Sequence, residues 1–225
     1  MSERRNASWR LLRFVAVTSS SGMSKDGDSV RQARAEQTQA KLLQATIELL
    51  VEVGYARAST PLIAKRAGVS RGAQTHHFPT RIKLVTAAVE WLADQRLAEL
   101  EVAGRSLPNG AQRIPAALDL LWSAFSGDFY KAVLELWIAS RTNPDLKGAV
   151  AAAERRLGRQ LVPTLAWLFG ESVAGQPQLD ERLQFVLAEL RGLALLDTFD
   201  GVSKAHREAQ WKFTRQVLID FLTKK

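Results

Sequence analysis

Apolar residues recur every three or four positions along almost the whole chain, and no stretch keeps up an alternation of apolar and polar residues. The first spacing places apolar side chains on one face of an α-helix, whereas a half-buried β-strand requires alternation. The pattern therefore predicts an all-α protein. Hydrophobic residues make up 46% of the 225 positions, so the helices are expected to bury a real core.

Glycine, proline and asparagine divide this pattern into segments. A first helix is expected over 38–53, because Gly54 supplies the backbone freedom that ends a helix. A fourth helix is expected over 80–103, after two short ones described below. Further breaks, the last of them at Asp200-Gly201, predict helices over 111–126, 128–141, 144–169, 179–199 and 204–222.

The segment 59–78 has the punctuation of two short helices joined by a tight turn. Thr60 can cap the first of these helices, and Pro61 suits its first turn. Gly68 permits a left-handed turn, Val69 fills the gap between the helices, and Ser70 can cap the second helix. The segment therefore predicts a helix-turn-helix within about twenty residues.

Positive charge is concentrated in the first part of the chain. Residues 1–96 hold 15 Lys and Arg against 8 Asp and Glu, a net charge of +7, whereas residues 97–225 hold 16 against 15, a net charge of +1. No acidic residue lies between Glu52 and Glu90. Such a segment suits a polyanion such as nucleic acid. The alternative is a solvated basic face, but such faces usually intersperse acids for pairing along a helix.

His76 and His77 are weak candidates for a metal or catalytic site. They are adjacent, so on a helix they point about 100° apart rather than to one face. No carboxylate lies within 53–89, and the chain has no cysteine, so a ligand shell or an oriented acid-base pair has no local partner. We expect no metal. A buried structural histidine stays an open alternative for either residue.

The run STPLIAKRAGVSRGAQTHHFPTRIKLV resembles the DNA-binding segment of the tetracycline-repressor (TetR) family. The resemblance covers about residues 36–96. Where the family often has a Leu-Tyr pair, this chain has Gln74-Thr75. The positions that match the family pattern are Ile63-Ala64, the run 67–70, Gly72, Phe78 and Leu84.

The resemblance, together with helical geometry, predicts the residues that contact DNA. Side chains of the second short helix are expected to read base edges in the major groove, and these are Arg71, Gly72, Gln74 and Thr75. Caps, helix starts and flanking cations are expected to contact phosphates, and these are Thr60, Ser70, His77, Arg81 and Lys83. The alternative for the base-reading set is ordinary polar helix surface. Lys65 and Arg66 either contact the DNA backbone or solvate their helix.

The resemblance implies an N-terminal three-helix helix-turn-helix DNA-binding domain, assigned to residues 35–96, and a larger C-terminal helical ligand-binding and dimerisation domain, assigned to 97–225. Residues 1–34 are expected to form a disordered basic arm. Arg10 and Arg13 interrupt or abut the apolar run of this arm and leave only Phe14–Val17, which is too short for the apolar core of a secretory signal, so export is not expected. No apolar run is long enough for a membrane span, so we expect no membrane association. The absence of cysteine favours the reducing cytoplasm as the expected location.

Two apolar sets in the second half are candidates for ligand and partner contacts. Aromatic residues that could surround an effector pocket are Trp91, Trp122, Phe125, Phe129, Trp137 and Trp167. They could equally be plain core. Apolar residues of the last two helices that could form a dimer interface are Leu183, Leu187, Leu190, Phe213, Val217 and Phe221. Burial within one subunit is the alternative.

The function implied by the resemblance is that of a transcriptional repressor. It would bind a pseudo-palindromic operator in double-stranded DNA as a homodimer and would be released by a small hydrophobic effector. No cofactor and no enzymatic activity are expected. Two alternatives stay open: a regulator of the same fold that has no effector or activates transcription, and an enzyme or small-molecule carrier whose basic segment is incidental.

Overall fold

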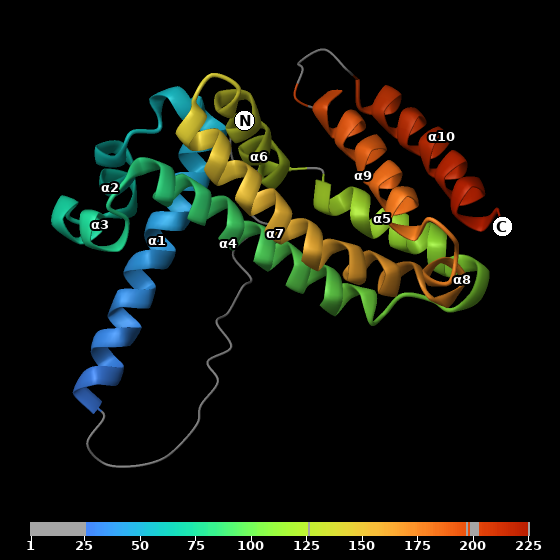
Figure 1. Ribbon diagram of the computed structural model, residues 1–225, viewed down its shortest axis with the longest axis horizontal. Helices are drawn as coiled ribbons and strands as arrows, with labels where there is room; N and C mark the ends of the chain where they lie inside the picture. The colour runs from blue at the N-terminus through green and yellow to red at the C-terminus, as the bar shows by residue number, and fades with distance from the viewer. Residues whose placement is uncertain (1–25, 126, 197, 199–202, 225) are drawn as a thin grey trace. The chain divides into compact units, whose positions relative to one another are not determined.

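The computed structural model describes residues 26–125, 127–196, 198 and 203–224 (Figure 1). Within these residues there is no β-strand, so the predicted all-α class is confirmed. None of the described helices is both long and apolar enough to cross a membrane. The helices are α1 (Asp26–Arg57), α2 (Thr60–Ala67), α3 (Arg71–His77), α4 (Arg81–Gly104), the 3-10 helix η1 (Gly110–Gln112), α5 (Arg113–Phe125), α6 (Asp128–Ser140), α7 (Pro144–Phe169), α8 (Glu171–Ala174), α9 (Leu179–Leu196) and α10 (Lys204–Thr223).

The first helix begins earlier than the sequence pattern predicted. The chain divides into two units after Glu36, and the described part of the first, residues 26–36, is helical. Good helix formers fill residues 31–36, and Gln32 donates a hydrogen bond to Glu36, 3.1 Å away, one turn later. Its side chains are exposed from Ser29 to Glu36, so it lacks the apolar period that marks a packed helix. Residues 1–25 of the predicted arm, and the predicted break at Asp200-Gly201, lie outside the described residues.

Two clusters of buried apolar side chains stabilise the larger unit. One joins α1, α2 and the start of α4 to α6 and the start of α7, and α6 contributes Ala132 and Leu136 to it. The other joins the second half of α4 to α5, α7, α9 and α10. The boundary expected near residue 96 therefore falls inside α4, between Leu92 of the first cluster and Leu97 of the second. Helix α4 is a continuous element shared by both cores.

Candidate nucleic-acid interface and cavity

Local hydrogen bonds fix the turn between α2 and α3. Gly68 has left-handed backbone angles (φ 65°, ψ 34°), which an L side chain rarely adopts. The N–H of Val69 donates to the carbonyl of Ala64 over 3.0 Å, and the Ser70 hydroxyl accepts from the N–H of Ala73 over 3.2 Å. Ile63 and Phe78 are buried beneath the two helices. The chain thus forms the predicted helix-turn-helix, with α3 as its second helix (Figure 1).

The outer surface of α3 is polar, basic and free of acids. Arg71, Gly72, Thr75 and His76 are exposed. A Cβ added at Gly72 would meet no atom within 4 Å, so the glycine is not required by packing and leaves a low point on the surface. This surface can approach another molecule closely while presenting hydrogen-bond donors.

Gln74 lies on the opposite side of α3, which corrects its prediction as a base contact. Its side chain is only 5% exposed, and its amide nitrogen donates to the carbonyl of Phe78 over 2.8 Å. The bond caps the end of α3 from within and satisfies a buried polar group. Gln74 therefore stabilises the end of α3, and the exposed candidates for base contact are reduced to Arg71, Gly72 and Thr75.

The residues predicted to contact phosphates surround α3 but differ in how exposed their side chains are. Ser70 and Lys83 are exposed, whereas Thr60 and His77 are half-buried. The guanidinium carbon of Arg81 lies 4.0 Å from the centroid of the Tyr55 ring. Arg81 is thus folded against α1 in this structure, and Lys83 is the exposed cation of the first turn of α4.

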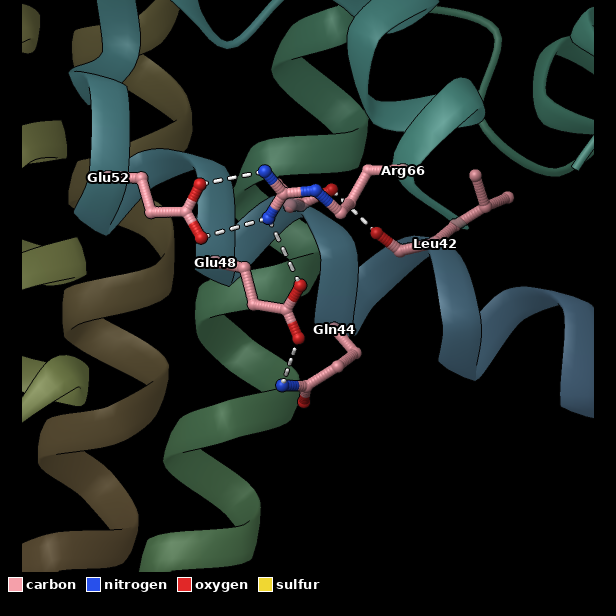
Figure 2. Close-up of polar contacts among 6 residues, drawn as sticks. Leu42, Gln44, Glu48, Glu52 and Arg66 are labelled. Carbon is pink, nitrogen blue, oxygen red and sulfur yellow. Dashed lines mark hydrogen bonds and ion pairs between the residues drawn. The ribbon is translucent and has the colours of Figure 1, made fainter. Parts of the chain in front are cut away.

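Arg66 is held by two glutamates of α1, as Figure 2 shows. Its two terminal nitrogens lie 2.9 and 2.7 Å from the carboxylate oxygens of Glu52, and one of them lies 3.4 Å from Glu48. The hydrogen bond from Arg66 lowers the pKa of Glu52. Lys65 and Arg66 were each expected either to contact the DNA backbone or to solvate their helix. Arg66 instead links α2 to α1 as a clamp through the two glutamates, while Lys65 stays exposed.

Replacing this clamp is expected to cost little stability at neutral pH and less in acid. Arg66→Met should lower the free energy of unfolding by at most about 1 kcal/mol, because the bidentate pair is partly exposed and screened. The lowered pKa of Glu52 means that its contribution is present above the unfolded-state pKa, about 4.3, and is lost as the pH falls below it. Urea unfolding at pH 7 and pH 3.5 measures both. Lys65→Met is the matched control; an Arg66 deficit that does not shrink in acid would contradict this account.

A small apolar cavity lies between α4, α5, α6, α7 and α9. Its volume is about 50 Å³, and its aromatic walls are Phe125, Phe129, Tyr130 and Trp137. Room of this size admits a water molecule or two, whereas pockets for organic ligands usually measure about 300–1,000 Å³. As it stands in this structure, the cavity is too small for an organic ligand.

Several polar groups in the cavity wall are paired with one another, whereas Arg96 bonds to Glu99 over 2.6 Å and its Nε is buried without a hydrogen-bond partner among the described residues. The indole N–H of Trp137 donates to Glu154 over 3.0 Å, and Glu154 lies 3.7 Å from Arg191. The Arg191 guanidinium also lies 5.1 Å from the Trp137 ring, and the Tyr130 hydroxyl donates to the Arg191 carbonyl over 2.8 Å. Burial raises the pKa of Tyr130. The mostly apolar wall favours weakly polar, apolar molecules, and the Nε–H of Arg96 is the one buried donor of the described wall residues without a partner.

Three of the six predicted pocket residues, Phe125, Phe129 and Trp137, line this cavity. The other three do not. Trp91 packs on the first core cluster, Trp122 stacks on Trp211 with ring centroids 5.1 Å apart, and Trp167 is 43% exposed. No sequence signal marked the polar wall residues Arg96, Glu154 and Arg191, because each is a single charged residue on a different helix.

An exposed apolar face runs over α9 and α10. Phe185 and Val217 are 43% and 44% exposed, Phe213 is 73% exposed, and the rings of Phe185 and Phe221 lie 4.8 Å apart. Large exposed apolar side chains gathered in this way are typical of an interaction surface.

Three residues predicted for a dimer interface do not belong to this face. Leu183, Leu187 and Leu190 are buried in the second core cluster of the chain itself. They lie on the inner side of α9, so the prediction is corrected in their case, and burial within one subunit applies to them. Phe213, Val217 and Phe221 stay candidates, with Phe185 added.

The chain resembles known regulators in sequence. The profile of a family described as "Bacterial regulatory proteins, tetR family" matches residues 42–88. The HTH-type transcriptional regulator CymR of Pseudomonas putida is 32% identical over 165 residues, which cover 72% of this chain and 80% of CymR. An HTH-type transcriptional regulator of Mycobacterium tuberculosis is 39% identical over 117 residues, which cover 52% of this chain and 60%, less than two thirds, of that protein.

Solved structures share the fold. A transcriptional regulator from a Rhodococcus species superposes with a TM-score of 0.65 and 23% identity, covering 83% of this chain and 98% of that one. The multidrug binding protein EbrR complexed with ethidium superposes with a TM-score of 0.60 and 20% identity, covering 82% of this chain and 97% of that one. At these identities the likeness shows a common fold and no more.

Proposed function

The chain belongs to the TetR family of bacterial regulatory proteins and is a DNA-binding transcriptional regulator, and on this premise we propose that it is a homodimeric repressor released from its operator by a small hydrophobic effector. The observation that carries the proposal is the acid-free, exposed surface of α3 at the end of a helix-turn-helix. Its proposed partners are double-stranded DNA, a second copy of the chain and the effector, and its proposed location is the cytoplasm. An enzymatic activity is not part of the proposal.

For DNA binding, we assign base contacts to Arg71, Gly72 and Thr75. Arg71 can donate two hydrogen bonds to O6 and N7 of guanine, and Thr75 can contact a thymine methyl group. Their exposure at the start and middle of α3 supports this role. The proposed phosphate contacts are Thr60, Ser70, His77 and Lys83, because helix starts and cations around a recognition helix set its register on the duplex. Arg81 would reach a phosphate only by leaving the Tyr55 ring.

For dimerisation, we assign the contact to the exposed face of α9 and α10. Phe185, Phe213, Val217 and Phe221 would be covered by the same residues of a second copy, as a two-fold interface requires. Two linked subunits would place two recognition helices about one duplex turn, roughly 34–36 Å, apart. The proposed operator is therefore pseudo-palindromic.

For effector binding, we assign the site to the cavity walled by Phe125, Phe129, Tyr130 and Trp137. An organic ligand needs several times the present volume of about 50 Å³, so its entry would separate the surrounding helices. Helix α4 lines the cavity through Leu97 and also begins beside α3, so such a movement can reach the DNA-binding surface. The apolar wall supports an uncharged or weakly polar effector.

Salt dependence of operator binding tests the central proposal. The purified protein is expected to prefer a pseudo-palindromic duplex recovered by binding selection. Its affinity should fall with salt at a log-log slope of about −0.9 per phosphate contact, because bound cations release condensed counterions. Fluorescence anisotropy over a salt series, with a scrambled duplex of equal length as control, measures both. Equal affinity for the two duplexes at every salt concentration would remove the proposal.

A second candidate function is a regulator of the same fold that responds to no small molecule. The observation that favours it is the small cavity volume, about 50 Å³. The two candidates differ in the fluorescence of Trp137, which forms part of the cavity wall. An effector that releases DNA must bind with lower affinity when operator is bound, because coupling between two sites is reciprocal. A titration of tryptophan emission with and without operator measures the two affinities, and Trp137→Phe identifies the part of the signal that comes from the cavity.

A further inference from the structure

Helix α1 is interrupted at Gly54, where a carboxylate from α6 meets its backbone. Gly54 has a positive φ of 74° with ψ at 168°, a combination open to glycine and strained for other residues. The next backbone N–H, that of Tyr55, donates to Oε2 of Glu135 over 3.1 Å. A Cβ at Gly54 would lie 2.9 Å from the same oxygen, so a side chain there would push the Glu135 carboxylate aside in addition to straining the backbone. The interruption is thus a fitted contact between α1 and α6.

The Tyr55 side chain connects this contact to the start of α4. Its ring lies 4.0 Å from the guanidinium carbon of Arg81, the first residue of α4. Nε and one terminal nitrogen of Arg81 are buried without a hydrogen-bond partner among the described residues. The ring is therefore a principal contact of this guanidinium, and a cation over an aromatic face is held by electrostatic attraction. A displacement of Tyr55 would release or redirect Arg81.

Helix α6 also forms one wall of the cavity. Tyr130, Val133 and Trp137 line the cavity, whereas Glu135 lies on the far side of the helix, because residues two apart on a helix point about 200° apart. A movement of α6 caused by a change of cavity volume would therefore be carried directly to the backbone of α1. The path runs from Val133 through Glu135 and Tyr55 to Arg81, which follows the recognition helix after a three-residue connection.

We propose that Glu135 is a positioning residue that transmits the state of the cavity to the DNA-binding helices through Tyr55 and Arg81. This inference rests on the proposed function, since it concerns how cavity and operator are coupled. The competing path is α4 alone, because α4 lines the cavity through Leu97 and also carries Arg81. The two paths differ in whether the coupling depends on the carboxylate of Glu135.

The test replaces the unidentified effector by a side chain that fills the cavity. Ala124 lies in the cavity wall on α5, and Ala124→Phe adds a ring to this small cavity, so the neighbouring helices are expected to shift to accommodate it. Operator affinity is measured by fluorescence anisotropy for the wild type, Ala124→Phe, Glu135→Ala and the double variant. We expect Ala124→Phe to weaken operator binding by about 5-fold or more, as an allosteric coupling of ordinary size does, and by less than about 2-fold once Glu135 is alanine.

Two further variants separate a positioning role from general destabilisation. Glu135→Gln keeps an oxygen that can accept the Tyr55 N–H, so it is expected to restore the response to Ala124→Phe. Glu181→Ala, an exposed glutamate on α9, should leave the response unchanged. Thermal unfolding checks that each protein is folded; if Ala124→Phe is not, Leu157→Trp in the same cavity wall replaces it.

The outcomes are distinct. If Ala124→Phe causes an equal loss in the wild type and in the Glu135→Ala background, this inference is overturned and the coupling is assigned to α4, while the effector mechanism stands. No loss from either cavity-filling variant would mean that the cavity does not communicate with the operator, which would overturn the effector mechanism and this inference together. A loss that disappears in Glu135→Ala and returns in Glu135→Gln would support both.

Discussion

Phe213→Glu is expected to convert the protein into monomers and to weaken operator binding by about 100-fold or more, because two half-sites would no longer be held by one linked molecule. Phe213 is the most exposed of the large apolar side chains, at 73%, and lies on α10 beside Val217 and the Phe185–Phe221 pair. A glutamate there would be buried at the proposed dimer contact without a partner, which costs several kcal/mol. Sedimentation velocity measures the mass, and anisotropy on a full operator measures the affinity.

Val102→Glu is the matched control, since Val102 is an apolar side chain of similar exposure, 67%, near the end of α4. It should leave mass and operator affinity unchanged. A half-site duplex adds a second check, because Phe213→Glu should bind it as well as the wild type does. A Phe213→Glu protein that still sediments as a dimer would place the contact elsewhere on the chain.

The helix-turn-helix could be predicted closely because neighbouring residues set its limits. Gly68 provides the left-handed turn and Ser70 the cap of α3, and both act within a few residues of their own position. The same holds for Asn143, whose side chain accepts from the N–H of Leu146 over 3.0 Å at the start of α7. The family resemblance added what such local signals could not, namely the expectation that α3 reads DNA.

The side on which a residue lies was harder to predict, because it depends on contacts between helices. Leu183, Leu187 and Leu190 form an apolar stripe that would suit a partner's surface as well as the chain's own core. In the structure they are buried in the second core cluster. Gln74 is polar and sits in a polar helix, yet the carbonyl of Phe78 lies where its amide can bond, so it turns inward. Neither outcome is encoded in the spacing of residues along one helix.

Contacts between residues far apart in the sequence could not be predicted either, because they also depend on how the helices pack. Glu135 lies 80 positions after Tyr55, and nothing near either residue indicates that they meet. The Arg66 clamp is similar: the acids that hold it belong to another helix, so an arginine in an acid-free segment looked available for DNA. In both cases the packing of the helices decides which charges are free.

Arg71→Ala is expected to weaken binding to the preferred operator by about 1–3 kcal/mol, a factor of about 5–150, and to relax the choice of base at one position. Arg71 is exposed at the first position of α3 and makes no hydrogen bond or ion pair with another described residue, so its guanidinium is free to meet a base edge. The loss should be large because a bidentate contact to guanine carries both affinity and specificity. Anisotropy on the operator, on single-base variants and on a scrambled duplex measures it.

Lys83→Ala is the comparison variant that distinguishes a base contact from a phosphate contact. Lys83 is an exposed cation in the first turn of α4, so its removal should weaken all duplexes alike and flatten the salt slope by about one. Arg71→Ala should instead reduce the ratio of operator to scrambled affinity, because only the operator offers the correct base. If Arg71→Ala weakened both duplexes equally and flattened the salt slope as Lys83→Ala does, Arg71 would be a phosphate contact. Base reading by α3 would then fall to Thr75 and to the close approach that Gly72 permits.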